Sequence, residues 1–248
     1  HFVTNINYNE KGQRTEIYYG NNSKTSYEYH DKTFRLTRLL TTRNSGNDIL
    51  QDINYTYDPV GNITQTTDNA QQTHYFNNTV IAPTGIYTYD ALYRLKTATG
   101  RELTSLQLPT HTDFVNNIPT PNTSANAMQN YTQQFQYDEL GNIEQMKSVG
   151  NWTRDYYYDF ANDKNYLLGH TYGTTEYTYD KHGNTLSMPH LTSMLWDNKD
   201  QLKEVTLNAS GDKAYYVYDA SGERERKIIE KTGGIVEERI YLGGYEVY

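Results

Sequence analysis

The sequence contains no cysteine, and only 6 proline and 4 methionine residues among its 248 positions. The absence of cysteine excludes disulfides and thiol chemistry, and it is compatible with either redox compartment. No apolar stretch approaches the roughly 20 residues that a membrane-spanning helix needs. The first residues also lack the basic and apolar regions of a signal peptide. We therefore expect no signal peptide in this chain and no membrane insertion by this segment.

Positive charge is scarce as well. The chain has 22 Lys and Arg against 30 Asp and Glu, which gives a formal net charge of −8. Its basic run, Arg224-Glu225-Arg226-Lys227, is interrupted by an acid. Binding to a phosphate backbone needs clustered Lys and Arg, so we expect no nucleic-acid partner.

Catalytic and metal-binding patterns are also missing. The seven His residues show no H-E-x-x-H or comparable metal spacing, and no EF-hand, G-x-S-x-G or phosphate-binding glycine pattern occurs. One set of aspartates recurs at the same position of each predicted turn, where capping of the local backbone accounts for it: Asp58, Asp90, Asp138, Asp180 and Asp219. We expect no enzymatic activity, no cofactor and no metal site.

The residue that the chain has in excess is tyrosine, with 26 copies against 6 Phe. An aromatic side chain with a polar tip suits a strand face that is half exposed to water. The low mean hydropathy of −0.89 raises the question of disorder. Disordered chains are poor in aromatic and β-branched residues, however, so we predict a folded, all-β chain.

One stretch, residues 53–63, describes a β-hairpin by itself. Apolar and polar residues alternate from Ile53 to Asp58, with the period of a strand. Asp58-Pro59-Val60-Gly61 then has the composition of a type I turn, in which Asp accepts backbone N–H groups and Pro fixes φ. Asn62 tolerates a left-handed backbone, and Ile63 begins the returning strand.

This hairpin is repeated along the chain. Tyr8 to Gln13 is a degenerate copy, and clear copies follow at intervals. In each copy, Asp should cap the turn and Gly should allow a positive φ. The candidate structural residues of this first turn type are Tyr57, Asp58, Gly61, Asn62, Tyr137, Asp138, Gly141, Asn142, Tyr179, Asp180, Gly183, Asn184, Tyr218, Asp219 and Gly222.

A second turn type alternates with the first, and in it a polar residue followed by Leu replaces Gly-Asn. Its candidate residues are Tyr89, Asp90, Arg94 and Leu95, and related forms occur at 29–36, 158–167 and 196–202. We expect a small polar residue to take the positive φ here. Gly233-Gly234 and Gly243-Gly244 are typical of further hairpin turns.

Hairpins spaced about 20 residues apart must pair side by side to bury a face. The fold class predicted is therefore all-β, a series of antiparallel hairpins in a long curved sheet that spans residues 1–248 as one region. Residues 100–130 interrupt the series, and their prolines, Asn and Thr indicate a loop excursion from the sheet. The stretch 122–134, which overlaps its end, is compatible with one or two helical turns.

These alternating units resemble the YD repeats of the Rhs family, which includes bacterial Rhs toxins, the C subunits of insecticidal Tc toxin complexes, and the teneurins. A more specific resemblance is to the middle section of the Tc toxin C subunit. It rests on the segments 87–95, 98–102, 130–143, 152–154 and 241–248.

In that family, the repeats form a hollow shell around a C-terminal toxin, and a downstream aspartyl autoprotease core releases the cargo. The resemblance implies a structural shell segment from a secreted bacterial virulence factor. Its partners would be the rest of its own shell, the encapsulated toxin and a Tc B-type subunit. The chain stops before that core, so no catalytic aspartates are carried over.

Two other interpretations remain open at this point. The chain is alternatively an extracellular YD-repeat module that binds a glycan or a protein partner, or the scaffold beside an autoprotease. It begins at His1 without Met and ends in a strand-like run, so we expect a fragment of a larger protein. Open sheet edges in such a fragment favour self-association.

Overall fold

The computed structural model describes residues 2–76, 78–103, 128–170, 173–234 and 236–248. It divides into two compact units, of which the first ends at Thr153 and the second begins at Arg154. The regular elements of the described residues are β-strands and two short 3-10 turns, η1 (Asn44–Gly46) and η3 (Phe160–Asn162). The prediction of an antiparallel all-β hairpin fold is confirmed.

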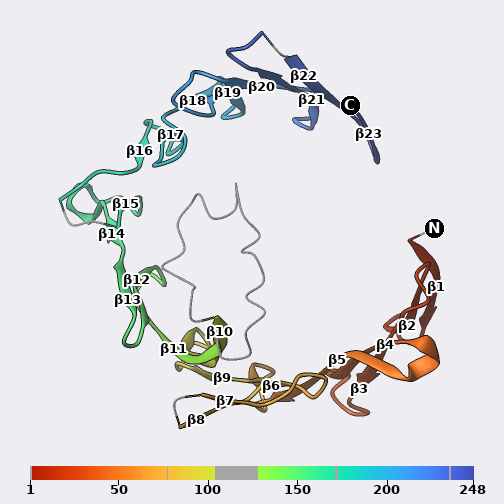
Figure 1. Ribbon diagram of the computed structural model, residues 1–248. Coiled ribbons are helices and arrows are strands. Elements are labelled where there is room, and N and C mark those ends of the chain that lie inside the picture. Colours follow the sequence, from red (N-terminus) through yellow and green to blue (C-terminus); the bar gives the residue numbers. More distant parts are fainter. Residues whose placement is uncertain (1, 77, 104–127, 171–172, 235) are drawn as a thin grey trace. The chain divides into compact units, whose positions relative to one another are not determined.

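The first unit is built on one sheet of eleven strands, in which strands that follow one another in the chain lie side by side. Figure 1 shows it as a continuous curved band from red β1 to green β13. Its strands are β1 (Val3–Tyr8), β2 (Arg14–Tyr19), β3 (Lys24–Tyr29), β4 (Leu36–Arg43), β5 (Asp48–Tyr57), β6 (Ile63–Asp68), β9 (Thr84–Tyr89), β10 (Leu95–Leu103), β11 (Met128–Tyr137), β12 (Ile143–Ser148) and β13 (Trp152–Asp155).

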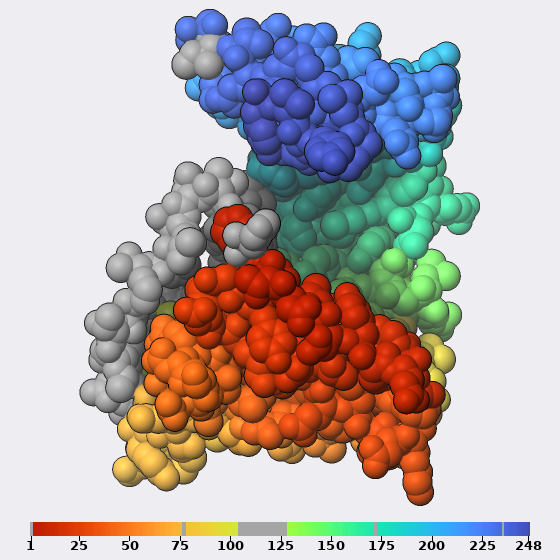
Figure 2. Space-filling view, turned by 90° about the vertical axis from the view of Figure 1, so that its right-hand side faces the viewer, coloured from red at the N-terminus to blue at the C-terminus, as the bar shows by residue number. Residues whose placement is uncertain are grey.

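The two faces of this sheet differ in chemistry because side chains alternate along each strand. On one face Tyr87 stands opposite Ala98, which is buried. On the other, Thr88 and Thr97 stand opposite each other with their hydroxyl oxygens 2.6 Å apart. Tyrosine therefore covers one face, and the other carries hydrogen-bonded polar side chains. In Figure 2 the strands from red to orange pack side by side into one surface.

The connections at the two ends of the strands differ as well. Every predicted repeat turn of this unit lies at the same end of the strands, which we call the motif edge. In an antiparallel meander, alternate connections fall on the same side, and all of these turns are alternate connections. They connect β1–β2, β3–β4, β5–β6, β9–β10 and β11–β12. Among the described residues, the connections at the opposite end of the strands vary in length from residues 149–151 to residues 69–83.

The loop predicted at residues 100–130 is shorter than expected, because both of its ends belong to strands. Strand β10 continues to Leu103 and β11 begins at Met128, while residues 104–127 lie outside the described residues. The suggestion of helical turns is wrong for 128–134, since Met128 pairs with Leu103 and Tyr131 with Gly100. The ring of Tyr131 packs on Gly100, with ring atoms 2.9 Å from the position that a Cβ would occupy there.

A hairpin that the repeat pattern did not predict lies between β6 and β9. It consists of β7 (His74–Phe76) and β8 (Thr79–Ile81), and Ile81 is the largest fully buried side chain among the described residues. Asn130 Nδ2 donates to the Val80 carbonyl over 2.9 Å, and Arg101 Nη1 donates to the Gln72 carbonyl over 2.9 Å. The hairpin is thus fastened to β10 and β11.

The second unit repeats the hairpin construction in shorter sheets, and its buried apolar side chains are Met194, Val205 and Ala214. Its strands are β14 (Tyr157–Tyr158), β15 (Leu167–Gly169), β16 (Thr178–Tyr179), β17 (Thr185–Ser187), β18 (Ser193–Trp196), β19 (Leu202–Thr206), β20 (Lys213–Tyr218), β21 (Arg224–Glu230), β22 (Val236–Leu242) and β23 (Tyr245–Val247). Gly243-Gly244 forms the predicted turn between β22 and β23. Among the described residues, no helix is long and apolar enough to cross a bilayer.

Candidate functional site: the hairpin turns and the tyrosines that join them

The turn at Asp58 closes through its own aspartate. Asp58 Oδ1 accepts the backbone N–H groups of Gly61 and Asn62 over 2.7 and 2.8 Å, and Oδ2 accepts Asn62 Nδ2 over 2.8 Å. The Asp58 N–H donates to the Asn62 carbonyl over 2.9 Å. Gly61, at φ +116°, takes the left-handed position. Asn62 therefore acts through its side-chain amide, and Gly61 takes the positive φ that the sequence predicts for the glycine of the turn.

The same arrangement recurs at the other first-type turns. Asp138 and Asp180 accept both the backbone N–H and the side-chain amide of the Asn four residues later, over 2.7 to 3.0 Å. At Asp219 the fourth residue is Glu223, which donates only its backbone N–H. The glycine of each turn has a positive φ, between 89° and 95°: Gly141, Gly183 and Gly222.

The second turn type differs in two ways. Bulky residues take the left-handed position, Tyr93 at φ 63° and Phe34 at φ 59°. The expectation of a small polar residue there holds for Asp163 at φ 54° and Asp200 at φ 59°. Instead of a closing Asn, Arg94 forms an ion pair with Asp90, with Nε 2.6 Å from Oδ2.

The arginine of a second-type turn also reaches the next first-type turn. Arg94 Nη1 donates to the Asp138 carbonyl over 3.0 Å, and Arg35 Nη1 donates to the Asp58 carbonyl over 2.9 Å. Each guanidinium lies over the tyrosine of that next hairpin, Arg94 at 4.7 Å from the Tyr137 ring centroid. The alternation of turn types thus joins neighbouring hairpins in pairs.

A second link between hairpins is made by the tyrosine that ends the strand before each turn. Its hydroxyl donates to the carbonyl of the residue that begins the returning strand of the preceding hairpin, over 2.7 to 3.0 Å. The pairs are Tyr29 with Arg14, Tyr57 with Leu36, Tyr89 with Ile63, Tyr137 with Leu95, Tyr179 with Leu167, and Tyr218 with Leu202. We call this series the tyrosine ladder.

The ladder accounts for the excess of tyrosine over phenylalanine, because phenylalanine has no donor. Where the aromatic residue is Trp196, its Nε1 makes the equivalent bond to the Thr185 carbonyl over 2.8 Å. Sequence reasoning missed these bonds, although the choice of Tyr or Trp at every such position was visible. In the second unit, the bonds of Tyr179 and Trp196 cross between separate sheets.

Removing one ladder bond should destabilise the fold measurably. We expect Tyr137→Phe to lower the free energy of unfolding by about 1–2 kcal/mol, because the carbonyl of Leu95 loses its donor while half-buried. Chemical denaturation followed by circular dichroism measures this. Tyr93→Phe, at a side chain that is 58% exposed, is the control and should change nothing measurable. Equal effects of the two substitutions would refute the ladder as a stabilising element.

The turn hydrogen bonds favour ionised aspartates. At Asp138, desolvation opposes ionisation, but the Asn142 amide and the backbone N–H groups of Asn142 and Gly141 outweigh it and lower the pKa. At Asp90 the backbone N–H and then the guanidinium of Arg94 lower the pKa against desolvation. The Asn184 amide is the leading cause of the lowered pKa of Asp180.

A carboxyl whose pKa is lower in the folded than in the unfolded chain contributes stability that is complete above the unfolded pKa and is lost as pH falls toward the folded pKa. The ordinary value for Asp is 3.8. We therefore expect a melting temperature that is steady from pH 7 to about 5 and falls below about pH 4. Combined Asp58→Asn and Asp138→Asn should flatten this fall. A loss that begins near pH 6 would instead implicate histidine.

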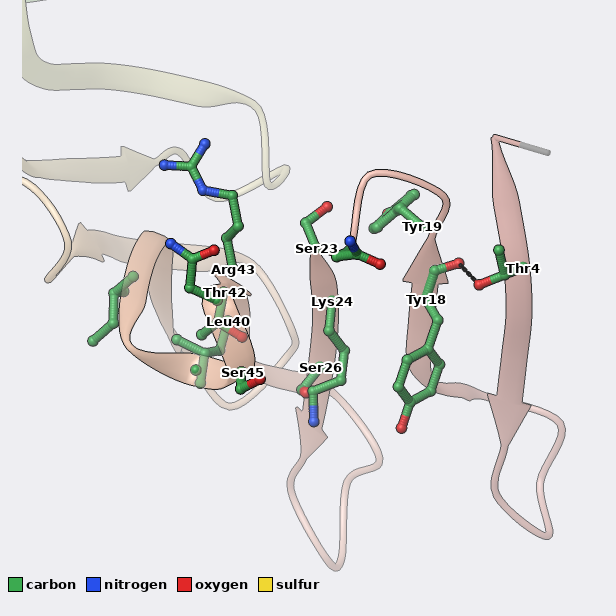
Figure 3. A pocket seen from close by; sticks show the side chains of 14 residues that line it. Thr4, Tyr18, Tyr19, Ser23, Lys24, Ser26, Leu40, Thr42, Arg43 and Ser45 are labelled. Atoms are coloured by element: carbon green, nitrogen blue, oxygen red, sulfur yellow. Dashed lines mark hydrogen bonds between the residues drawn. The ribbon is translucent and has the colours of Figure 1, made fainter.

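One hollow of the first unit lies away from the motif edge. It has a volume of about 850 Å³ and is lined by the ends of β1 to β4 and the loop 43–46. Figure 3 shows Tyr18, Lys24 and Ser26 on its wall and the bond from Thr4 Oγ1 to the Tyr18 carbonyl. Lys24 is already paired with Glu16 at 3.0 Å. No group of three or more metal-ligating side chains occurs among the described residues, here or elsewhere.

The construction defines the chain as a hairpin-repeat sheet whose turns and tyrosines join each hairpin to the next. No family model matches the sequence. Toxin subunits YenC1 and YenC2 of Yersinia entomophaga are 29% and 28% identical to it over 98% and 97% of this chain. The chain spans about a quarter of these relatives, 26% and 27% of their length.

Solved structures also resemble this chain. The Photorhabdus luminescens Tc holotoxin pore, with a mutated TccC3, matches 99% of this chain with a TM-score of 0.78 and 29% identity. The TcdB2-TccC3 crystal structure matches equally well, and this chain covers 12% of the matched chain in each. The resemblance to the C subunits of Tc toxins is thereby confirmed.

Proposed function

We propose that this chain is a wall segment of a Tc-type toxin shell that encloses a C-terminal toxin polypeptide. The observation that carries the proposal is the match of 99% of the chain, with a TM-score of 0.78, to a chain solved in a TcdB2-TccC3 structure. The proposed partners are the rest of the same shell, the enclosed toxin and a B-type subunit. The segment acts outside the producing cell as part of a secreted toxin.

The proposed role of the turn residues is structural. Asp58, Asp90 and Asp138 are each occupied by hydrogen bonds from their own turn, so they are not poised for acid–base chemistry. We propose accordingly that the segment is not an enzyme, and that residues 1–248 form one repeat region within a longer protein.

The binding-module interpretation has less support. Both curated relatives are toxin subunits, and neither is described as an adhesion protein. A wall segment needs links from hairpin to hairpin along the whole sheet, and the tyrosine ladder supplies them. A binding module would need several free polar groups that converge on one ligand. In the 850 Å³ hollow, by contrast, the lysine of the wall, Lys24, is already paired with Glu16.

The test is protection of the cargo in the longer polypeptide. We expect the C-terminal segment to resist a protease that digests it rapidly once released. The combined variant Tyr57→Phe, Tyr89→Phe and Tyr137→Phe should expose it, because three consecutive ladder bonds are lost. Tyr75→Phe with Tyr93→Phe, at exposed side chains, is the matched control. A cargo that is cleaved at the same rate in the intact wild type and after release contradicts the proposal.

A further inference from the structure

The first tyrosine of the repeat series, Tyr8, differs from the tyrosines of the ladder. It ends β1 before a repeat turn, which is the position that the ladder tyrosines hold in later hairpins. The Tyr8 side chain is 58% exposed, whereas the six ladder tyrosines are half-buried. Its hydroxyl has no hydrogen-bond partner among the described residues. Tyr8 therefore has the position of a ladder donor without an acceptor.

The turn at residues 9–13 belongs to the first type. Asn9 takes the place of the aspartate, and its Oδ1 accepts the backbone N–H of Gln13 over 2.9 Å. Gly12 has the positive φ of this type, 74°. Gln13 Nε2 also donates to the Phe34 carbonyl over 2.8 Å, so this turn contacts the hairpin that follows it in the chain.

The later first-type turns of this unit are contacted by the hairpin before them as well. Arg35 and Arg94 each donate to the carbonyl of the first residue of the next turn, over 2.9 and 3.0 Å. Their guanidinium groups lie 5.7 and 4.7 Å from the ring centroid of the next ladder tyrosine. The equivalent carbonyl and ring, at Asn9 and Tyr8, have no such arginine among the described residues.

Strand β1 has the composition of an interior strand, although it lies at the edge of the sheet (Figure 1). Its hydrogen-bonded neighbour is β2, so its other side presents backbone N–H and C=O groups without a strand beside them in the described part of the chain. Edge strands that face water usually carry charged side chains or proline, which prevent pairing with other strands. The segment Val3–Tyr8 contains neither. This composition indicates an edge that another strand covers.

Two regularities of the first unit identify that strand. The turn types alternate, with first-type turns at 9–13, 58–62 and 138–142 and second-type turns at 30–35 and 90–94. In every ladder pair, the acceptor carbonyl begins the returning strand of the hairpin before. The groups that Tyr8 and Asn9 lack are therefore those of a second-type hairpin, namely a carbonyl at the start of its returning strand and an arginine in its turn.

We propose that β1 pairs with a hairpin of the second turn type, from the part of the longer polypeptide that precedes residue 1. The returning strand of this hairpin lies against β1, and the carbonyl of its first residue accepts the Tyr8 hydroxyl. Its turn arginine donates to the Asn9 carbonyl and lies over the Tyr8 ring. This inference rests on the proposed function, in which the chain is one region of a longer shell protein.

A second copy of this chain does not supply the same groups. It would present its own β1 and its own turn at 9–13, which contains no arginine. Its Tyr8 would bring a second donor, where the ladder needs an acceptor. A second-type hairpin brings both the acceptor and the arginine, as the hairpin with the turn 30–35 does for Tyr57.

Hydrogen–deuterium exchange of the longer polypeptide tests the proposal. Alternate amides of an open edge strand point to water and exchange quickly. We expect the amides of residues 3–8 to exchange as slowly as those of β5, which lies between β4 and β6. Tyr8→Phe should raise the exchange rate in residues 3–8 by about fivefold and leave β5 unchanged, because one hydrogen bond is lost. Tyr75→Phe, at a side chain that is 75% exposed, is the control and should change neither.

The residues before His1 provide a second test. We expect a repeat turn there, one repeat upstream of Tyr8, with an arginine followed by leucine where its returning strand begins. Replacing that arginine with methionine should speed exchange in residues 3–8, as Tyr8→Phe does. The absence of such a turn overturns the proposal.

Fast exchange of alternate β1 amides in the native polypeptide also overturns the proposal, and so does a Tyr8→Phe variant that exchanges like the wild type. Protection that disappears on dilution overturns it too, because the partner is then a second copy. Cargo protection against protease, measured in the same samples, separates the two claims. If the cargo is protected while β1 exchanges quickly, the shell function stands and the hairpin contact fails. If β1 is protected while the cargo is digested as fast as after release, the contact stands and the shell function fails.

Discussion

Replacing Asp52 with alanine should lower the free energy of unfolding of the first unit by about 3 kcal/mol. The Asp52 carboxylate is 9% exposed and forms a two-point pair with Arg38, over 2.6 Å to Nε and 3.0 Å to Nη2. The Arg38 hydrogen bonds are the leading cause of the lowered pKa of Asp52. Removing the carboxylate leaves a partly buried guanidinium without its main partner, which costs more than a surface pair.

The chain provides a matched control for this experiment. Glu28 contacts the same guanidinium through Nη1 at 3.2 Å, but its side chain is 58% exposed. Glu28→Ala should therefore lie within experimental error of the wild type in urea denaturation. The double replacement Arg38→Met with Asp52→Leu should recover much of the loss, because it leaves no buried charge. If Asp52→Ala and Glu28→Ala have equal effects, the pair is not a stabilising element.

Gly61→Val should be the most damaging change in the turns, at about 3 kcal/mol. Two causes act together at this position. The backbone has φ +116°, which L-residues rarely adopt, and a Cβ here would lie 2.8 Å from Arg35 Nη2. Gly141, at φ +95°, has nothing within 4 Å of an added Cβ, so Gly141→Val should cost only about 1–2 kcal/mol. Thermal or urea unfolding measures both.

Removing Arg35 separates the two causes. In an Arg35→Ala background the clash is gone and only the backbone strain remains, so Gly61→Val should cost about as much as Gly141→Val. Identical costs in the presence and absence of Arg35 would show that the guanidinium does not constrain this turn.

Local patterns were enough to predict the hairpins. The alternation before Asp58 and the Asp-Pro-Val-Gly turn act within a few residues, so the strands, the capping aspartate and the glycine at positive φ follow directly.

Non-local contacts set the limit of sequence reasoning. The bond from Tyr57 to Leu36 spans 21 residues, and that from Arg94 to Asp138 spans 44. Neither can be derived without knowing which strands are neighbours. The β7–β8 hairpin escaped notice because its stability depends on burial of Ile81 against distant strands. Tyr93 at positive φ contradicts local preference altogether, and so it was not predictable from turn statistics.

The tyrosine ladder has a direction. In each pair the donor belongs to the later hairpin and the acceptor to the earlier one, from Tyr29 with Arg14 to Tyr218 with Leu202. A ribosome delivers the chain in the same order, N-terminus first. Each hairpin thus emerges beside an acceptor that is already in place, and it can dock without waiting for residues still to be made. We expect the sheet to grow during translation one hairpin at a time, with only the newest edge open to misassociation.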